Sequence, residues 1–577
     1  MPALTTSFHS GAPLAEPAPQ SASWVRDIAI LSVVCGLWFC ALLGLRPLGN
    51  PDEGRYSEIP REMAATGDFV TPRLNGVQYF EKPPLVYWLS ALTFRQFGVS
   101  EFTARLWGGI FAVLGVLLAY AAGRALYGRL SGVWAAIVLS TNIFYYVLSQ
   151  IILLDMAVAV TITGCLLSFI LAVREPRGRR RFWLFMGCYV FMALATLSKG
   201  LIGIAIPGAV MFFWLLLLNQ WHKLMPFHPI AGTILLLAIA APWHILAART
   251  HPDFLNFYFV HEHWLRFTTR VHGRYEPWWF FLPMFFGGLF PWSVFISETW
   301  RTSVGSWKSR TLNSEAWFFL IWIVFIVGFF SISQSKLIPY ILPVFPPAAV
   351  LIGRALAHAW RNQPEGGFFL AGRGFICFSF LLAVAVVIVP APGDQPDLAA
   401  RLPYFRAAAG FVLVAGMAGT IMGLRRKLPR LVIGSIVGTF VAVLVTVSIG
   451  AATFEKTSTR KFATMIKPIL KPEDRVYSVG TYTQDLPVYL NRLIHVVDYR
   501  GELAYGIDAE PEMTSARFLN REDFPDDWNR PGDAYAVVRP KAYERWFLPK
   551  IPNHRVIARS ARFVLVSKSV DPVQPQP

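Results

Sequence analysis

The sequence predicts an all-α polytopic membrane protein with about thirteen transmembrane helices, interfacial helices in its first outer loop, and a small soluble α/β (or α+β) domain at its C-terminus. Three observations support this class. The chain of 577 residues is 54% hydrophobic and only 15% charged, whereas soluble domains carry roughly 25% charged residues. Its apolar residues occur in runs of roughly 20, the length that crosses a bilayer as a helix. From about Glu455 these runs give way to short β-like segments separated by polar turns.

The apolar runs define a transmembrane unit over residues 24–454. The first run, Ile28–Leu45, has no small-residue cleavage site after it, so we interpret it as a span and not as a signal peptide. The residues before it, 1–23, are rich in Ala, Pro and Ser and predict a disordered cytoplasmic tail. We expect the further spans near 102–123, 131–149, 152–173, 182–198, 201–220, 229–247, 278–298, 316–333, 337–353, 374–390, 406–423 and 431–453.

The basic residues indicate how these spans are oriented. Clusters of Arg and Lys follow the fourth, eighth, tenth and twelfth predicted spans, and the first cluster is Arg174–Arg181. Even-numbered loops share one side of the membrane, and the excess of positive charge makes that side the cytoplasm. We therefore expect the N-terminus to be cytoplasmic. The long loops 46–101 and 248–277 and the C-terminal domain 455–577 are then on the outer side of the membrane.

Charge and cysteine content exclude other classes. A net charge of +18 favours nucleic acid in a soluble protein, but here orientation signals and anionic membrane lipids account for it, so we expect no nucleic-acid partner. The five Cys residues all lie within apolar runs and none has C-x-x-C spacing. Neither a disulfide framework nor a cysteine zinc site is indicated.

The C-terminal segment has the pattern of a soluble domain. Four short runs predict strands, at Arg475–Val479, Ile494–Val497, Tyr535–Val538 and Arg562–Val566. The intervening residues are turn-rich, and Asp508–Pro531 is rich in charge and Pro. The segment has no glycine-rich phosphate loop, so the domain carries no motif that assigns a role to it.

Acidic residues on the outer side are the first candidates for chemistry. Asp52 and Glu53 follow the first span, and the stretch Gly54–Thr66 predicts an amphipathic helix that carries Arg55. Adjacent acids alone are weak evidence, because a solvated surface loop also contains them. Asp155 begins an otherwise apolar span, where an ionisable side chain is costly and favours a function. The alternative for Asp155 is a cap at a helix N-terminus.

Outer cations are the second group of candidates. Lys199 and Lys336 stand between apolar runs on the outer side, and the loop 248–277 carries Arg266 and Arg270. These residues oppose the positive-inside bias. They are either snorkelling anchors or ligands for an anion, and Lys and Arg suit a phosphate.

A divalent metal is a further candidate ligand. Glu81 and His263 offer donors for zinc or magnesium, but separated single ligands do not define a coordination geometry. A structural role for the histidines of this loop stays open. The nearby aromatic residues Tyr79 and Tyr87 either contact a sugar or a prenyl tail or simply pack in the core.

Six short motifs carry a resemblance to a known family. They are P-D-E-G-R-Y at 51–56, Y-F-E-K-P-P-L-V-Y-W-L at 79–89, L-L-D ending at Asp155, S-K-G at 198–200, E-H-W-L-R-F at 262–267 and S-K-L-I-P-Y-I-L-P at 335–343. Together they resemble the membrane glycosyltransferases of the protein O-mannosyltransferase type, in the C superfamily of lipid-linked sugar transferases. Within that superfamily they are most similar to the bacterial lipid A aminoarabinose transferases, and the likeness covers almost the whole chain.

The resemblance implies a donor, an acceptor and a set of roles. The donor is undecaprenyl phosphate carrying 4-amino-4-deoxy-L-arabinose, and the acceptor is a lipid A phosphate at the periplasmic face of the bacterial inner membrane. We expect the protein to be a monomer. Asp52 and Asp155 match the catalytic acidic positions, and Glu81 and His263 are the candidate metal ligands. The substrate-binding candidates are Glu53, Arg55, Tyr56, Lys82, Lys199, Arg266, Arg270, Lys336 and Tyr340.

We expect a transfer that inverts the configuration at C1 of the sugar. The acceptor phosphate is already ionised, so Asp52 orients the nucleophile or stabilises positive charge at C1, and it acts as a general base only if the acceptor is a hydroxyl. Two alternatives remain open. The same fold could transfer another polyprenyl-linked sugar, or the protein could transport lipid-linked sugars, although a transporter predicts charges near the bilayer midplane.

Overall fold

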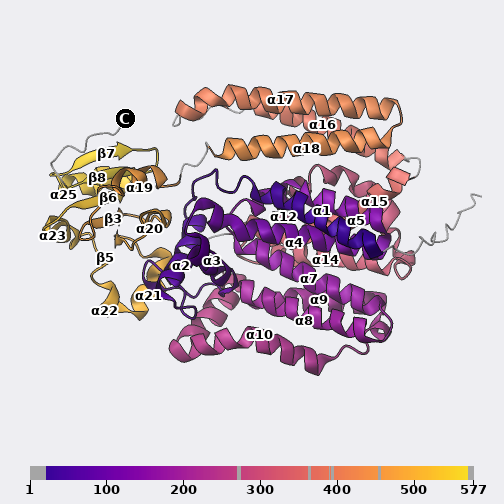
Figure 1. Ribbon diagram of the computed structural model, residues 1–577, viewed down its shortest axis with the longest axis horizontal. Coiled ribbons are helices and arrows are strands. Elements are labelled where there is room, and N and C mark those ends of the chain that lie inside the picture. Colours follow the sequence, from indigo (N-terminus) through magenta and orange to yellow (C-terminus); the bar gives the residue numbers. More distant parts are fainter. Residues whose placement is uncertain are drawn as a thin grey trace, which may run out of the picture.

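Long apolar helices form a bundle, and a smaller domain built on a β-sheet lies at one end of it (Figure 1). The computed structural model describes residues 21–269, 275–361, 366–388, 390, 396–452 and 457–568. The helices of the bundle are α1 (Ser21–Cys40), α4 (Glu101–Tyr127), α5 (Arg129–Ser140), α6 (Ile143–Ser149), α7 (Leu154–Arg174), α8 (Arg179–Lys199), α9 (Ile202–Leu218), α10 (Pro229–Thr250), α12 (Phe281–Gly288), α14 (Ser314–Ile332), α15 (Phe345–Arg361), α16 (Gly366–Ile388), α17 (Pro396–Arg425) and α18 (Pro429–Ala451). This architecture confirms the predicted class.

The apolar runs of the sequence fall on these helices. Within the described residues, ten helices are long and apolar enough to cross a membrane. Two bent pairs raise the number to twelve if each pair is one span: α5 with α6, bent by 61°, and α12 with Trp292–Val304, bent by 95°. The remaining predicted run is α9, which has 17 residues. The count of thirteen crossings therefore stays a prediction. Of the tail 1–23, only the last three residues are described, and they begin α1.

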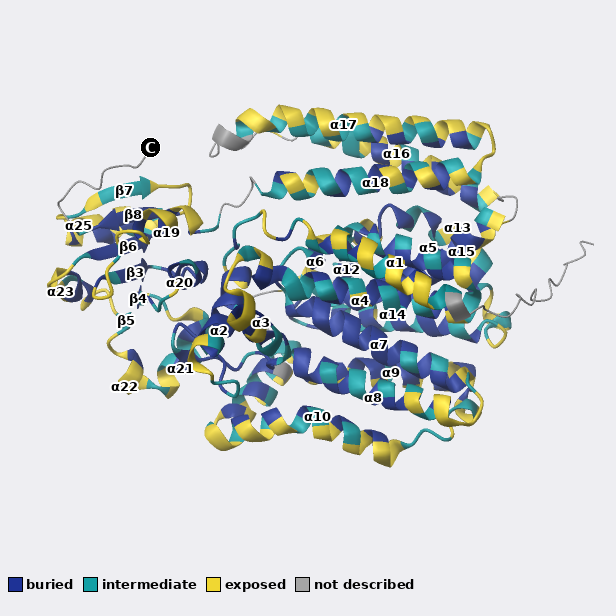
Figure 2. Cartoon of the chain, in the orientation of Figure 1, coloured by how far each residue is buried: buried dark blue, intermediate teal, exposed yellow. Residues whose placement is uncertain are grey.

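Burial separates core helices from lipid-facing ones. The α7 span is 89% buried, whereas the α1 span is 17% buried and the α10, α16 and α17 spans are each 22% buried (Figure 2). The exposed faces of these outer helices are apolar, with Val33 on α1 and Phe411 on α17 as examples. Apolar faces of this kind are stable only against lipid tails, so membrane lipids are a partner of this surface.

The first outer loop folds into two helices and a small hairpin. Its elements are α2 (Asp52–Thr66), β1 (Arg73–Leu74), β2 (Val77–Gln78) and α3 (Leu85–Phe97). The sequence predicts α2 to within two residues, but as an amphipathic helix along the membrane surface. In the structure ten of its fifteen residues are buried. The reason is tertiary: the C-terminal domain covers the polar face of α2, where Arg61 donates to both oxygens of Glu58 at 2.6 Å.

The C-terminal domain is built on a six-stranded sheet in the order β5-β4-β3-β6-β8-β7. Its strands are β3 (Arg475–Val479), β4 (His495–Val497), β5 (Phe518–Leu519), β6 (Ala534–Val538), β7 (Arg555–Arg559) and β8 (Val564–Ser567). The four neighbours β5, β4, β3 and β6 are parallel, and β8 and β7 extend the sheet antiparallel. All four predicted strands are present. Two further strands were not predicted. β5 has only two residues, and β7 is an edge strand that begins and ends with Arg.

The C-terminal domain docks on the loop that precedes α2. Asn50 donates from Nδ2 to Asp485 Oδ1, and the backbone N–H of Asp485 donates to Asn50 Oδ1 at 2.9 Å. Asp485 begins α20 (Asp485–Leu490), which lies against α2. This close approach requires a glycine in α2, because a Cβ added at Gly54 would lie 2.5 Å from Asp485 N and 2.7 Å from Gln484 C.

Replacing Gly54 by Ala tests this packing. The added methyl group meets backbone atoms of the C-terminal domain, and overpacking of this kind costs roughly 1–3 kcal/mol. We expect Gly54→Ala to lower the apparent melting temperature of the detergent-solubilised protein. The matched control is Gly36→Ala in α1, where an added Cβ has nothing within 4 Å. Identical melting of Gly54→Ala and Gly36→Ala would contradict the docking.

Candidate active site

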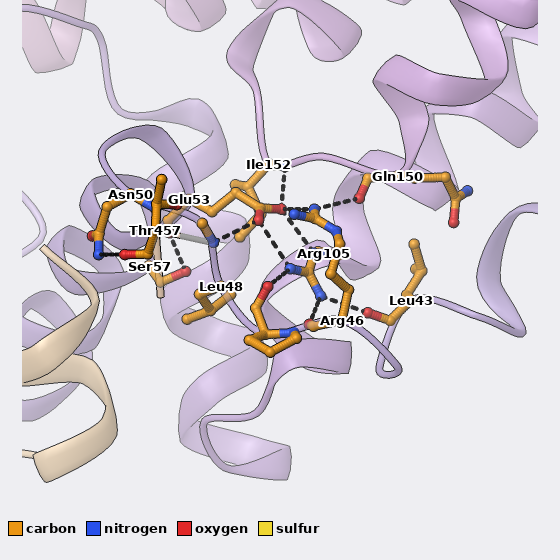
Figure 3. Close-up of polar contacts among 12 residues, drawn as sticks. Leu43, Arg46, Leu48, Asn50, Glu53, Ser57, Arg105, Gln150, Ile152 and Thr457 are labelled. Carbon is orange, nitrogen blue, oxygen red and sulfur yellow. Dashed lines mark hydrogen bonds and ion pairs between the residues drawn. The ribbon is translucent and has the colours of Figure 1, made fainter. Parts of the chain in front are cut away.

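Glu53 holds the first outer loop against the bundle. Arg105 donates to its two oxygens at 2.8 and 2.9 Å, and Arg46 Nη2 donates to Oε1 at 2.7 Å (Figure 3). The backbone N–H groups of Gly49 and Ile152 donate to the same carboxylate at 2.8 and 3.3 Å. Burial disfavours the charge on Glu53, but the two guanidinium groups outweigh burial and hold its pKa below the usual value. The carboxylate is fully occupied, so the geometry gives Glu53 a positioning role and leaves no oxygen for a substrate.

Arg105 extends this network into the backbone. Its side chain is 1% exposed, and its terminal nitrogens donate to the carbonyls of Leu43, Arg46 and Pro47, which follow α1. A buried guanidinium is stable only when its donors are satisfied. The backbone of the segment between α1 and α2 is therefore fixed, because its carbonyls accept from Arg105 and its Gly49 N–H donates to Glu53.

Asp52 is the exposed member of the acidic pair. Its side chain is 50% exposed, whereas that of Glu53 is 3% exposed. Successive residues at the start of α2 point in different directions around the helix, so the inward turn of Glu53 directs Asp52 outward. The nearest cation is Arg55, whose Nη1 lies 3.5 Å from Asp52 Oδ1. Asp52 is thus placed to meet a ligand.

Arg55 connects this acid to the C-terminal domain. It forms an ion pair with Glu502, and Gln484 Nε2 donates to Glu502 Oε1 at 2.7 Å. Arg55 Nε and the hydroxyls of Tyr79 and Tyr87 are buried without a hydrogen-bond partner among the described residues. Buried polar groups are rarely left unpaired. These unpaired groups fit a site that a polar ligand, such as a sugar with several hydroxyls, completes.

A group of cations forms the second half of the site. Lys82 Nζ lies 3.3 Å from Glu262 Oε2, and Arg266 Nη1 donates to the same oxygen at 2.9 Å. Arg266 Nη2 also donates to the hydroxyl of Tyr340 at 3.3 Å. Lys82 comes from the turn before α3, whereas Glu262 and Arg266 come from η2 (Asn256–Leu265) and α11 (Arg266–Thr268) in the second outer loop. Three separate segments therefore converge.

The ends of two spans complete the group. Lys199, the last residue of α8, forms an ion pair with Asp155 in the first turn of α7. The Lys199 ammonium also lies 4.6 Å from the centre of the Tyr340 ring. Asp155 thus positions Lys199, and its predicted catalytic role stays a prediction. The sequence predicts both residues at the same side of the membrane, but not that they pair.

The clustered cations of this group suit an anion. Lys82 and Arg266 lie beside the carboxylate of Glu262 and Lys199 beside that of Asp155, and the charge of Glu81 also acts on Lys82 and Arg266. Burial and the charge of Arg266 lower the pKa of Lys82, against the opposing effect of Glu262. A bound phosphate would offset the cost of burying the Lys82 ammonium and its repulsion by Arg266, since it places negative charge beside both cations.

Tyr56 joins the two halves of the site. Burial raises the pKa of its phenol, Arg55 opposes this shift, and the charges of Asp52, Glu81 and Asp155 raise it further. The Tyr56 ring centre lies 6.2 Å from that of Tyr87 and 5.6 Å from the Arg55 guanidinium. The charges of acids from separate segments therefore act on one phenol.

Several predicted site residues are placed differently or lie outside the description. Lys336 is buried away from this group: its Nζ donates to the carbonyl of Ser333 at 2.6 Å and lies 5.6 Å from the Tyr275 ring centre. Arg270 and the side chain of His263 lie outside the described residues. Among the described residues, no group of three or more His, Cys, Asp and Glu side chains is arranged to hold a metal. Glu81 is half-buried, and its charge acts on Lys82 and Arg266.

Three side chains of the candidate site were not predicted from the sequence, namely Arg105, Glu262 and Glu502. Arg105 interrupts an apolar run, which is the signal for an intramembrane ionisable residue. Glu262 directly precedes His263 within a quoted motif, but nothing in the sequence pairs it with Lys82. Glu502 has no signal at all, because only the fold of the C-terminal domain brings it to Arg55.

Replacing Glu53 by Gln tests the positioning network. Removing one partner of a buried ion pair leaves uncompensated charge and typically costs roughly 3–5 kcal/mol. We expect Glu53→Gln to melt at a lower temperature and to misplace Asp52. The control is Glu101→Gln, which breaks the partly exposed pair with Arg460 and costs at most about 1 kcal/mol. Equal melting temperatures for the two variants would show that the network is not stabilising.

Comparisons with known proteins agree with both halves of the structure. Residues 49–258 match the family model described as dolichyl-phosphate-mannose-protein mannosyltransferase, and residues 462–568 match the aminoarabinose transferase C-terminal domain. A crystal structure of ArnT from Cupriavidus metallidurans bound to undecaprenyl phosphate superposes with a TM-score of 0.83 at 29% identity. The match covers 96% of this chain and 100% of that one.

Relatives of known name extend over nearly the whole chain. The undecaprenyl phosphate-alpha-4-amino-4-deoxy-L-arabinose arabinosyl transferase 2 of Sodalis glossinidius is 30% identical over 513 residues, which is 87% of this chain and 90% of that protein. The corresponding transferase of Erwinia tasmaniensis is 29% identical and covers 92% of this chain. The fold is therefore that of the C superfamily of membrane glycosyltransferases, and this chain belongs to the family of undecaprenyl phosphate-alpha-4-amino-4-deoxy-L-arabinose arabinosyl transferases.

Proposed function

We propose that this protein transfers 4-amino-4-deoxy-L-arabinose from undecaprenyl phosphate to a phosphate of lipid A at the periplasmic face of the bacterial inner membrane. The observation that carries the proposal is the group of three cations, Lys82, Arg266 and Lys199, in one site with the half-exposed Asp52. A polyprenyl phosphate places its tail in lipid and its phosphate at the span ends, where this group lies. Family membership supplies the sugar.

The chemistry follows from the charges. An oxygen of the acceptor phosphate forms a bond to C1 of the sugar, and the bond from C1 to the polyprenyl phosphate oxygen breaks with its electron pair. The attack comes from the opposite face, so C1 is inverted. Lys82 and Arg266 stabilise the charge on the departing phosphate. Asp52 orients the acceptor or stabilises positive charge at C1, and it needs to accept no proton because the acceptor is ionised.

The amino group of the sugar needs a carboxylate. Two carboxylates of the first outer loop, Glu53 and Glu81, are candidates, and Glu53 is occupied by Arg46 and Arg105. Glu81 makes no ion pair in the described part of the chain through its side chain, although it lies close enough to act on Arg55 and Arg266. We therefore assign amino-group recognition to Glu81.

The orientation of the termini is part of the proposal. The site lies at the start of α7, and the other end of α7 is Arg174, in the loop with the largest basic cluster. The positive-inside rule makes that loop cytoplasmic, which leaves the site and the attached C-terminal domain in the periplasm. The N-terminus is then cytoplasmic.

A divalent metal held by Glu81 and His263 stays a prediction. The described donors do not make a metal site by themselves, and no step above depends on one. Treatment with EDTA, followed by zinc or magnesium, tests it directly. Loss of transfer that either ion restores supports the metal, and an unchanged rate in EDTA excludes a requirement for it.

The transfer itself is tested with purified protein, undecaprenyl-phosphate-linked aminoarabinose and lipid A. We expect mass spectrometry to find lipid A with an added aminopentose. Asp52→Asn should lower the rate at least about 100-fold and leave donor binding within about twofold. Asp253→Asn, in an exposed position of the second outer loop, is the matched control. Normal transfer by Asp52→Asn would exclude the assigned role, and no aminopentose with wild-type protein would exclude the function.

A further inference from the structure

The parallel part of the C-terminal sheet has a doubly wound topology. In chain order its strands are β3, β4, β5 and β6, and in space their order is β5-β4-β3-β6. The chain therefore leaves β3 in one direction, through β4 to β5, and returns to the other side of β3 with β6. This reversal makes the junction of β3 and β6 a topological switch point.

Helices cover both faces of this sheet, as the topology requires. One face carries Val476 and Val496 and packs in the same core as Leu486 of α20. The other face carries Tyr477 and packs with Phe524 of α23 (Phe524–Asn529). In open sheets of this kind, ligands bind outside the carboxyl ends of the strands at the switch point.

The carboxyl ends of these strands face the active site. Six residues after β3 ends, Asp485 exchanges hydrogen bonds with Asn50. Five residues after β4 ends, Glu502 pairs with Arg55. In Figure 1 α20 and α21 (Ala504–Ala509) lie between the sheet and α2. The edge where such a domain binds ligands is therefore the edge that adjoins Asp52.

The switch point carries an available cation. Arg539 directly follows β6, is exposed, and makes no side-chain hydrogen bond or ion pair with any described residue. By contrast Arg500, on the same edge, is paired with Asp508. Burial and Glu502 raise the pKa of Tyr499, after β4, while Arg55 and Arg539 oppose the rise. The charges of Arg539 and Arg55 thus act on the same phenol, and Arg539 follows the strand paired with β3, whose carboxyl end leads to Asp485 beside Asn50.

We propose that this edge of the C-terminal domain binds the phosphorylated sugar headgroup of the acceptor, with Arg539 holding a phosphate other than the one that reacts. The proposal rests on the proposed function, since it concerns that acceptor. The donor phosphate already has three cations in the membrane domain. An acceptor with two phosphates has to place the reacting phosphate beside Asp52. The positive charge of Arg539, outside the membrane, is then available to bind the other phosphate. A guanidinium at a switch point suits this task because it binds phosphate with two hydrogen bonds.

The test measures the KM for lipid A and for the donor with purified full-length protein in detergent. We expect Arg539→Ala to raise the KM for bisphosphorylated lipid A about tenfold, the loss of one charge-assisted contact, with kcat and donor KM within about twofold. Arg539→Lys should recover part of the loss. The matched control is Lys471→Ala, an exposed cation just before β3 at the opposite edge of the sheet, which should leave both KM values unchanged.

Monophosphorylated lipid A separates the possible results. If Arg539 binds the second phosphate, wild-type protein and Arg539→Ala have similar KM values for an acceptor that lacks it. An unchanged KM for bisphosphorylated lipid A in Arg539→Ala overturns the inference, and so does an equal rise in donor KM. Transfer by wild-type protein in the same assay shows that the proposed function stands even if the inference fails. Equal melting temperatures of the variants exclude misfolding as the cause of a raised KM.

Discussion

The buried carboxylate of Glu53, shared between Arg105 and Arg46, is the interaction on which the rest of the site depends. Three charged groups are removed from water between the ends of α1, α4 and α7, and such a group is stable only when each member is hydrogen-bonded. The donors come from two guanidinium groups and two backbone N–H groups in separate segments. The loop after α1 therefore has little conformational freedom. Asp52, which directly precedes Glu53, is held in place by the same contacts.

The C-terminal domain supplies the second constraint. Asn50 and Arg55, on either side of Asp52, are both held by residues that follow strands of its sheet, Asp485 and Glu502. The segment around Asp52 is thus held from the bundle on one side and from the sheet on the other. This arrangement explains why a domain without a recognisable motif accompanies the spans: it completes the wall of the site.

Prediction succeeded where the physical signal is local. A sufficiently long run of apolar residues predicts a span at any position in the chain. The positive-inside rule applies to each short loop separately, so a cation in an outer loop can be recognised as an exception. For this reason Lys199 and Arg266 could be named as candidates from the charge pattern, whereas Lys82 was named through the family resemblance. Which of these side chains form ion pairs with one another could not be predicted from the sequence. Asp155 and Lys199 meet because α7 and α8 are antiparallel neighbours, and Lys82 meets Glu262 across 180 residues of chain.

The adjacent acids Asp52 and Glu53 show most clearly what could not be predicted from the sequence. By itself the sequence determined the membrane class, the end of the spans at which the polar residues gather, and four strands of the soluble domain. It could not tell which acid of the pair is exposed, because that depends on Arg105, more than fifty residues away in the chain. Only the tertiary structure decided that Glu53 is buried and positioning, that Asp52 is exposed, and that Glu502 joins the site. Burial and charge pairing between distant segments are properties of the fold, and no local pattern encodes them.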